Sequence, residues 1–275
     1  MGAEASEVAL GPSDLALDRA GAAAARLLGY GESKRGAVRA APVREQFIRS
    51  SGTAPPPLAA VLRGGRGGEV RLKLYLSILW IAAKAPYDVS FPARAWAELL
   101  DLPDAGRHGT RRISDAIDWL SAAQLIAVER GRGRAPKLTL LDDGGRGVAY
   151  EPPWAANERY IKLLPGFWTK GWLATLSGTA VAILIILLDQ HYLKPNEAFW
   201  ISPKRARELY DLSSDTWSKG LAELVGFGLV SVSRIPVDEA FSWSRVRNSH
   251  VVHIRRLSLK PDQSRAETMW EPVLT

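Results

Sequence analysis

The most informative segment of this sequence is residues 202–234, SPKRARELYDLSSDTWSKGLAELVGFGLVSVSR. Ser202 can cap a helix with Pro203 at its first position, and Ser213 can cap a second helix after a short turn. Apolar residues then recur at helical spacing before a strand-like alternation, so the segment predicts two helices and a β hairpin. The second helix is expected to turn inward Trp217, Leu221, Leu224 and Val225, and outward Asp215, Thr216, Ser218, Lys219 and Glu223.

The same pattern occurs earlier in the chain. Residues 97–102, AELLDL, align with residues 207–212, RELYDL, at an offset of 110. Residues 116–130, AIDWLSAAQLIAVER, align with residues 220–234, GLAELVGFGLVSVSR, at an offset of 104. An internal duplication of this kind predicts that one fold occurs twice in the chain.

Each copy is expected to contain a long apolar helix, a short strand, two further helices and a two-stranded hairpin. In the first copy we expect helices at 72–84, at 92–102 and from about Thr110, with Ile113, Ile117 and Leu120 facing inward. In the second copy we expect a buried helix at 180–188, capped by Ser177, and a short strand at 199–201. A membrane span is the alternative for this apolar run, but the run is about half the roughly 20 residues that a span needs.

Changes in composition along the chain mark the boundaries between the expected domains and linkers. A helix capped by Ser13 and ending at Gly29 precedes a stretch rich in Gly, Pro, Ser and Arg over 31–68, which predicts a mobile basic linker. This linker could lie along phosphates or simply be solvated. Gly and paired Pro separate the two copies and predict two separate cores. The expected parts are an N-terminal helix with a basic flexible arm (1–68), a first domain (69–142), a linker (143–159), a second domain (160–260) and a C-terminal tail (261–275).

The chain carries 36 Lys and Arg against 29 Asp and Glu, a net charge of +7 that favours a polyanionic partner or merely aids solubility. The absence of cysteine excludes disulfides, thiolate metal sites and a cysteine nucleophile. The first residues, MGAEASEVAL, are acidic and lack the apolar run of a secretory signal, so we expect a cytoplasmic protein.

Basic residues gather at two places in the first copy: the outer face of its third helix, and the Gly-bearing turn of ERGRGRAPKLTLL, residues 129–141. A helix of this kind fits the major groove of DNA, and arginines on a loop suit a narrow minor groove, although a solvated hairpin tip is the alternative. The residues expected to contact DNA are Arg107, His108, Thr110, Arg111, Arg112, Ser114, Arg132, Arg134 and Lys137 in the first copy, and Lys204, Ser214, Thr216, Ser218, Lys219, Arg245 and Arg247 in the second.

Each copy resembles a winged-helix DNA-binding domain, and the tandem arrangement resembles plasmid replication initiators of the two-winged-helix type. The resemblance rests on the order of elements. It implies a mostly α fold with small β wings (α+β), built from two tandem winged-helix domains plus an N-terminal helix and a basic linker. It also implies that both domains can touch repeated origin sites and that one can form a homodimer. The basic N-terminal arm and the long apolar helix of the second copy depart from this pattern.

Three functions follow from these features. The first is origin binding as a replication initiator, and the second is regulation (repression) of transcription of a plasmid or mobile element. Both use double-stranded DNA and contacts with replication or transcription machinery. The third is a protein-interaction adaptor, which the less basic third helix of the second copy favours.

Catalysis finds no support, because the chain lacks phosphate-loop, nucleophile-elbow and zinc-protease motifs. His250 and His253 have an HxxH spacing, but without neighbouring acidic or cysteine ligands they are expected to be packed or surface residues rather than a metal site. We therefore expect a non-enzymatic protein that needs no cofactor or metal and does not contact a membrane.

Overall fold

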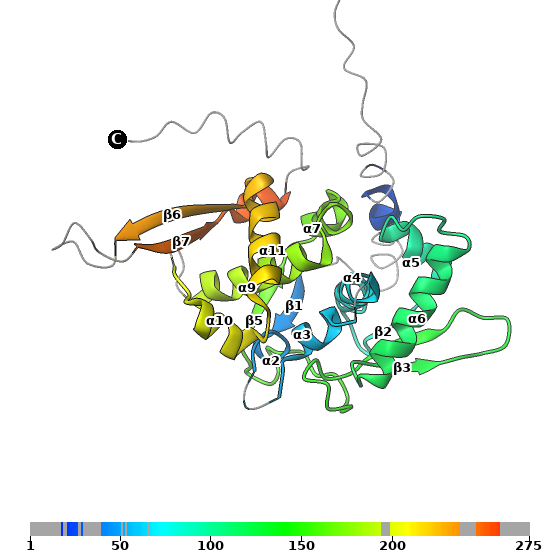
Figure 1. The fold of residues 1–275 in the computed structure, drawn as a ribbon. Coiled ribbons are helices and arrows are strands. Elements are labelled where there is room, and N and C mark those ends of the chain that lie inside the picture. Colours follow the sequence, from blue (N-terminus) through cyan, green and yellow to red (C-terminus); the bar gives the residue numbers. More distant parts are fainter. Residues whose placement is uncertain are drawn as a thin grey trace, which may run out of the picture.

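A computed structural model of the 275-residue chain describes residues 18, 21–26, 29, 40–50, 52, 54–64, 66–193, 199–236 and 246–258. Within these residues the fold is of the mixed α+β kind, with helices predominating over three small antiparallel sheets (Figure 1). Residues 21–26 of the expected N-terminal helix are helical. The expected cap Ser13 and the tail 261–275 lie outside the described residues.

The first copy of the repeat runs from α4 to β4. It comprises α4 (Arg66–Ile81), β2 (Asp88–Ser90), α5 (Ala93–Leu99), α6 (His108–Ala122), β3 (Ile126–Glu129) and β4 (Lys137–Leu140). The three strands form one antiparallel sheet in the order β2-β4-β3, with Leu138 opposite both Val89 and Val128. The element order agrees with the prediction, although α4 and α6 each start earlier in the chain than expected.

The second copy repeats this order with a smaller sheet. It comprises α9 (Gly178–Leu193), α10 (Pro203–Tyr210), α11 (Ser214–Gly226), β6 (Val230–Pro236) and β7 (Val246–Val252), followed by a 3-10 helix, η1 (Ile254–Ser258). The strand expected at 199–201 is reduced to a bridge between Phe199 and His250 of β7. The hydroxyl of Ser202 accepts a hydrogen bond from the backbone N–H of Arg205, and that of Ser213 accepts one from the backbone N–H of Thr216, so both predicted N-caps are confirmed.

Helix α9 is a core helix. Every residue from Ala180 to Leu188 is buried, and the Ser177 hydroxyl accepts a 3.1 Å hydrogen bond from the backbone N–H of Ala180, as its predicted role as a cap requires. Among the described residues, no helix combines the length and the apolar character that crossing a membrane demands.

The prediction of a mobile linker over 31–68 is wrong for most of residues 41–63. Residues 41–63, called here the N-terminal strap, contain β1 (Ala41–Arg44), α2 (Glu45–Ile48) and α3 (Pro57–Leu62). Val43, Phe47 and Ile48 are fully buried. The strap folds because its apolar residues enter the core and because its arginines find acidic partners far away in the sequence.

The strap is attached to both copies of the repeat. Helix α3 packs against α4 of the first copy. Strand β1 pairs antiparallel with β5 (Tyr160–Leu163), and the Arg44 guanidinium lies 2.5 Å from Asp143, which follows the first copy. Arg49 lies 2.5 Å from Asp189 of α9 in the second copy. Burial raises the pKa of the Asp143 and Asp189 carboxyl groups, and the arginines beside them oppose that shift.

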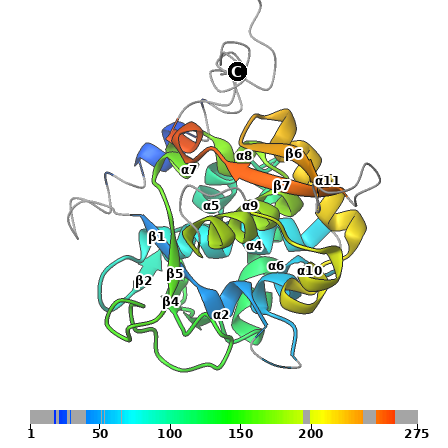
Figure 2. The same ribbon diagram turned by 90° about the vertical axis from the view of Figure 1, so that its left-hand side faces the viewer.

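The two copies share one core, whereas the sequence predicted two. After β5 come two short helices, α7 (Gly166–Thr169) and α8 (Trp172–Thr175). Trp168 of α7 stacks on Trp80 of α4 with ring centroids 4.5 Å apart, and its indole N–H donates a 3.1 Å hydrogen bond to Ser77. Buried residues of both copies form one continuous cluster, and α4 and α9 lie in the middle of the molecule (Figure 2). Packing between the first helices of the two copies therefore fixes their relative placement.

Candidate nucleic-acid interface

Helix α6 carries the first half of the candidate interface. Its inner face is anchored by Ile113, Ile117 and Leu120, which are buried as predicted. Three side chains at its start are exposed: His108 has 81% of its side chain accessible, and Arg107 and Arg111 are also exposed. Within the described part of the chain neither arginine has an ion pair, whereas His108 lies 3.9 Å from Asp104. Two guanidinium groups are therefore available to an external anion.

Three predicted contact residues on α6 are engaged inside the protein. The Thr110 hydroxyl donates to the carbonyl of Ala105 at 2.6 Å, and the Ser114 hydroxyl donates to the carbonyl of Thr110 at 3.2 Å. Arg112 is half-buried, and its positive charge interacts electrostatically with Glu69 near the start of α4. Burial alone would raise the pKa of Glu69, but Lys73, a backbone hydrogen bond and Arg112 together lower it. The prediction that Arg112 lies on the outer face is therefore wrong.

The β3–β4 hairpin carries the second half of the candidate interface. At its base Arg130 forms an ion pair with Asp118 of α6, and Lys137 donates to Glu129 at 3.0 Å and lies 3.9 Å from Asp88. Lys137 is thus already paired with carboxylates, unlike the arginines at the tip of the hairpin.

The tip of the hairpin differs from its base. Arg132 and Arg134 are exposed and have no ion pair among the described residues. They flank Gly133, whose φ of +70° is a backbone conformation that suits glycine and lets the tip turn tightly. The base of the hairpin is therefore braced by ion pairs, while its tip presents two unpaired guanidinium groups.

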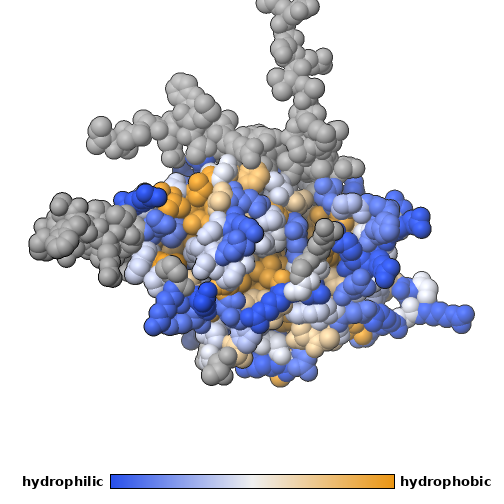
Figure 3. All heavy atoms as spheres, viewed as in Figure 1, coloured by the Kyte–Doolittle hydropathy of each residue, from blue (hydrophilic) through white to orange (hydrophobic). Residues whose placement is uncertain are grey.

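These two places lie on one side of the molecule. Figure 1 shows α6 and the β3–β4 loop together at the right-hand edge, with the loop projecting outward. In the same view hydrophilic residues cover this edge, as Figure 3 shows. The four unpaired arginines are Arg107, Arg111, Arg132 and Arg134. A surface of this kind can neutralise phosphates on both sides of a helix that enters a groove.

The corresponding surface of the second copy is close to neutral. Lys219 lies 2.8 Å from Asp215, and Lys204 lies 4.0 Å from Glu208. The Thr216 hydroxyl is hydrogen-bonded to that of Ser213, while Ser214 and Ser218 are exposed. The side chain of Arg247, on β7, and the whole of Arg245 lie outside the described residues. The basic character of the first copy is therefore not repeated on α11.

Two other predictions for α11 are wrong. Val225, expected to face inward, is 43% exposed. Glu223, expected to face outward, accepts hydrogen bonds from the backbone N–H and the hydroxyl of Ser177, at 2.8 and 2.6 Å. The helix is rotated because Gly220 faces α9, where a Cβ atom would lie 2.6 Å from Ile183.

His250 is packed between aromatic rings. It is 2% exposed, its ring centroid lies 5.8 Å from that of Phe199 and 6.4 Å from that of Trp217, and neither ring nitrogen has a hydrogen-bond partner. Burial lowers its pKa. His253 bonds to Ser231 instead, and the described residues contain no cluster of three or more His, Asp or Glu side chains that could hold a metal ion.

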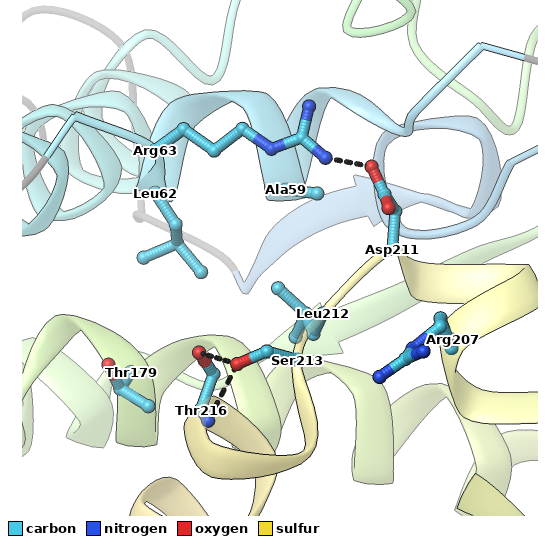
Figure 4. Close-up of a pocket in the computed structure, with 9 residues that line it drawn as sticks. All are labelled: Ala59, Leu62, Arg63, Thr179, Arg207, Asp211, Leu212, Ser213 and Thr216. Carbon is cyan, nitrogen blue, oxygen red and sulfur yellow. Dashed lines mark hydrogen bonds and ion pairs between the residues drawn. The ribbon is translucent and has the colours of Figure 1, made fainter. Parts of the chain in front are cut away.

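The structure also contains a pocket that sequence reasoning missed. It has a volume of about 470 Å³ and lies between α3 of the strap and the α10–α11 turn (Figure 4). Arg63 and Arg207, which line it, come from distant parts of the chain, so no motif or spacing could have joined them.

Comparison with known proteins gave no match to the chain among protein-family models, curated proteins or solved structures. The function must therefore be argued from the geometry of the described residues. Of the predicted contact residues, Arg107, His108 and Arg111 are exposed at the start of α6, and Arg132 and Arg134 are exposed in the β3–β4 loop. These two elements lie at one edge of the molecule (Figure 1).

Proposed function

We propose that the chain binds double-stranded DNA without catalysing a reaction, and that α6 with the β3–β4 loop is the surface that holds the duplex. The observation that carries this proposal is the set of four exposed arginines that lack ion pairs on these two neighbouring elements. Many other described arginines and lysines pair with a nearby carboxylate, as Arg94 does with Glu98 at 2.9 Å. Unpaired guanidinium groups bind phosphates and release the counterions that DNA holds.

We further propose that both copies are winged-helix domains. The support is the order helix, strand, helix, helix and hairpin in each copy, together with the sheet order β2-β4-β3 in the first. In such a domain the third helix enters the major groove. Here α6 would read bases through Arg111, while Arg107 and the hairpin tip would contact the backbone.

A titration of labelled duplex DNA at several salt concentrations tests this proposal. Three phosphate contacts, from Arg107, Arg132 and Arg134, predict a slope of log affinity against log salt of about −2.7, which is about a 40-fold loss of affinity between 50 and 200 mM salt. A variant with alanine at Arg107, Arg111, Arg132 and Arg134 should lose nearly all of this dependence. Arg94→Ala is the matched control, because Arg94 is exposed but paired. Equal binding by the fourfold variant and the wild type would refute the proposal.

We propose that the role of this DNA binding is origin recognition by a plasmid replication initiator. Regulation of transcription is the alternative role. The support is the tandem repeat, which suits repeated sites. Sequencing of the DNA bound in cells separates the two roles. Repeated sites at an origin would favour the initiator, and a single site at a promoter would favour the regulator.

A second candidate function is favoured by the neutral surface of α11. Its lysine is paired with Asp215, and Val225 is 43% exposed at its end. This copy would then contact a protein of the replication or transcription machinery. A Val225→Asp variant should bind DNA as the wild type does but lose that association.

A further inference from the structure

The pocket between the strap and the second copy has the features of an anion site. Its roof is α3 with Arg63 at its end, its back is the first turn of α9, and its floor is the α10–α11 turn (Figure 4). The volume of about 470 Å³ is within the range of small-ligand pockets, which is roughly 300–1,000 Å³.

Two guanidinium groups supply positive charge to this pocket. Arg207 is exposed, has no ion pair among the described residues, and points toward Ser213 in Figure 4. Arg63 forms an ion pair with Asp211, in which 57% and 39% of the two side chains are accessible. Asp211 is the one carboxylate among the residues that line the pocket, so it is the internal anion with which a ligand would compete for Arg63.

The remaining walls suit a ligand larger than a bare ion. Thr179 and Thr216 offer hydroxyl groups, while Leu62 and Leu212 form an apolar wall. Arginine pairs with phosphate through two parallel hydrogen bonds, and an apolar wall can cover a sugar or a base.

We propose that this pocket binds the phosphate group of a nucleotide, held by Arg63 and Arg207, with the nucleoside against Leu62 and Leu212. The nucleotide is either free or part of a DNA strand. Only the second case rests on the proposed DNA-binding function, and the experiment separates the two.

The first arm titrates ADP into the full chain by calorimetry in the absence of DNA. Arg207→Ala and Arg63→Ala should each weaken ADP binding about tenfold or more, because a hydrogen bond to a charged group is lost. Arg205→Ala is the matched control: it removes an arginine from the same helix, one that lies 3.7 Å from Glu208 and does not line the pocket. Thermal unfolding of each variant checks that it folds.

Asp211→Asn should change ADP affinity in the opposite direction to the arginine variants. Asp211 has a φ of +49°, which asparagine tolerates well, so the backbone is retained. If Asp211 competes with the phosphate, its neutralisation should tighten ADP binding about two- to fivefold. A purely structural role for the Arg63–Asp211 pair predicts weaker binding instead.

The second arm measures duplex DNA binding by the same variants. If the nucleotide belongs to DNA, Arg207→Ala lowers the salt slope by about one while Arg205→Ala leaves it unchanged. ADP binding that depends on Arg207 supports a free nucleotide even if the chain binds no DNA. The proposal is overturned if neither ADP nor DNA binding responds to Arg207→Ala, or if Arg205→Ala has the same effect.

Discussion

The close crossing of α11 over α9 makes Gly220 a sensitive test of the second copy. A Cβ atom at this position would lie 2.6 Å from Ile183 Cγ1 and 2.9 Å from the backbone oxygen of Thr179. Carbon atoms normally approach to about 3.5–4.0 Å, so alanine must push the two helices apart. Overpacking of this kind costs about 3 kcal/mol, and alanine regains about 1 kcal/mol through its higher helix propensity. Gly220→Ala should therefore lower the free energy of unfolding by about 2 kcal/mol.

Gly226→Ala is the control, because Gly226 ends the same helix and its Cβ would meet nothing within 4 Å. This variant should be as stable as the wild type or up to about 1 kcal/mol more stable, since it has the gain in propensity without the clash. The two variants should differ by about 2–3 kcal/mol in urea unfolding followed by tryptophan fluorescence and circular dichroism. Equal stability of the two variants would show that α11 does not cross α9 at Gly220.

Three further predictions concern the wing, the strap and His250. Arg132→Ala should weaken cognate and random DNA by similar factors and lower the salt slope by about one, whereas Arg130→Ala, which removes a paired arginine, should leave the slope unchanged. Arg44→Ala leaves Asp143 buried without its partner, so it should cost about 3–5 kcal/mol in urea unfolding; a loss below 1 kcal/mol would mean that the strap is not held by this pair. Because burial lowers the folded-state pKa of His250, its contribution to stability is present above pH 6.5, the ordinary value, and is lost as the pH falls below it. Between pH 7.5 and 5.5 the wild type should lose up to about 1.4 kcal/mol more stability than His250→Phe, and equal losses would contradict the burial of a neutral ring.

Local patterns are sufficient to predict the helices and the hairpin of both copies. Ser177, Ser202 and Ser213 were identified as caps because an N-cap acts within three residues of its position. The stripe of Ile113, Ile117 and Leu120 was read from helical periodicity alone. On α11 the same reasoning failed at Val225, because a glycine that carries no hydrophobic signal sets which side of the helix faces α9.

The candidate site was predicted less completely. The sequence located the basic clusters, and Arg107, Arg111, Arg132 and Arg134 are exposed on α6 and the β3–β4 loop, two elements that lie at one edge. It could not tell which cations are already neutralised, as Lys137 and Lys219 are, because that depends on the carboxylates that the fold brings near.

By itself the sequence determined the order of elements, the internal repeat, the helix caps and the position of the basic hairpin, since each depends on residues close together in the chain. Only the tertiary structure decided that the strap is folded, that the two copies share a core and that a pocket joins Arg63 to Arg207. The interactions responsible join residues far apart, such as the Arg44–Asp143 and Arg49–Asp189 pairs, which span 99 and 140 positions. No periodicity or motif encodes pairings over such long stretches of sequence. They form because folding buries the apolar surface of many elements at once and pairs the charges that are buried with it.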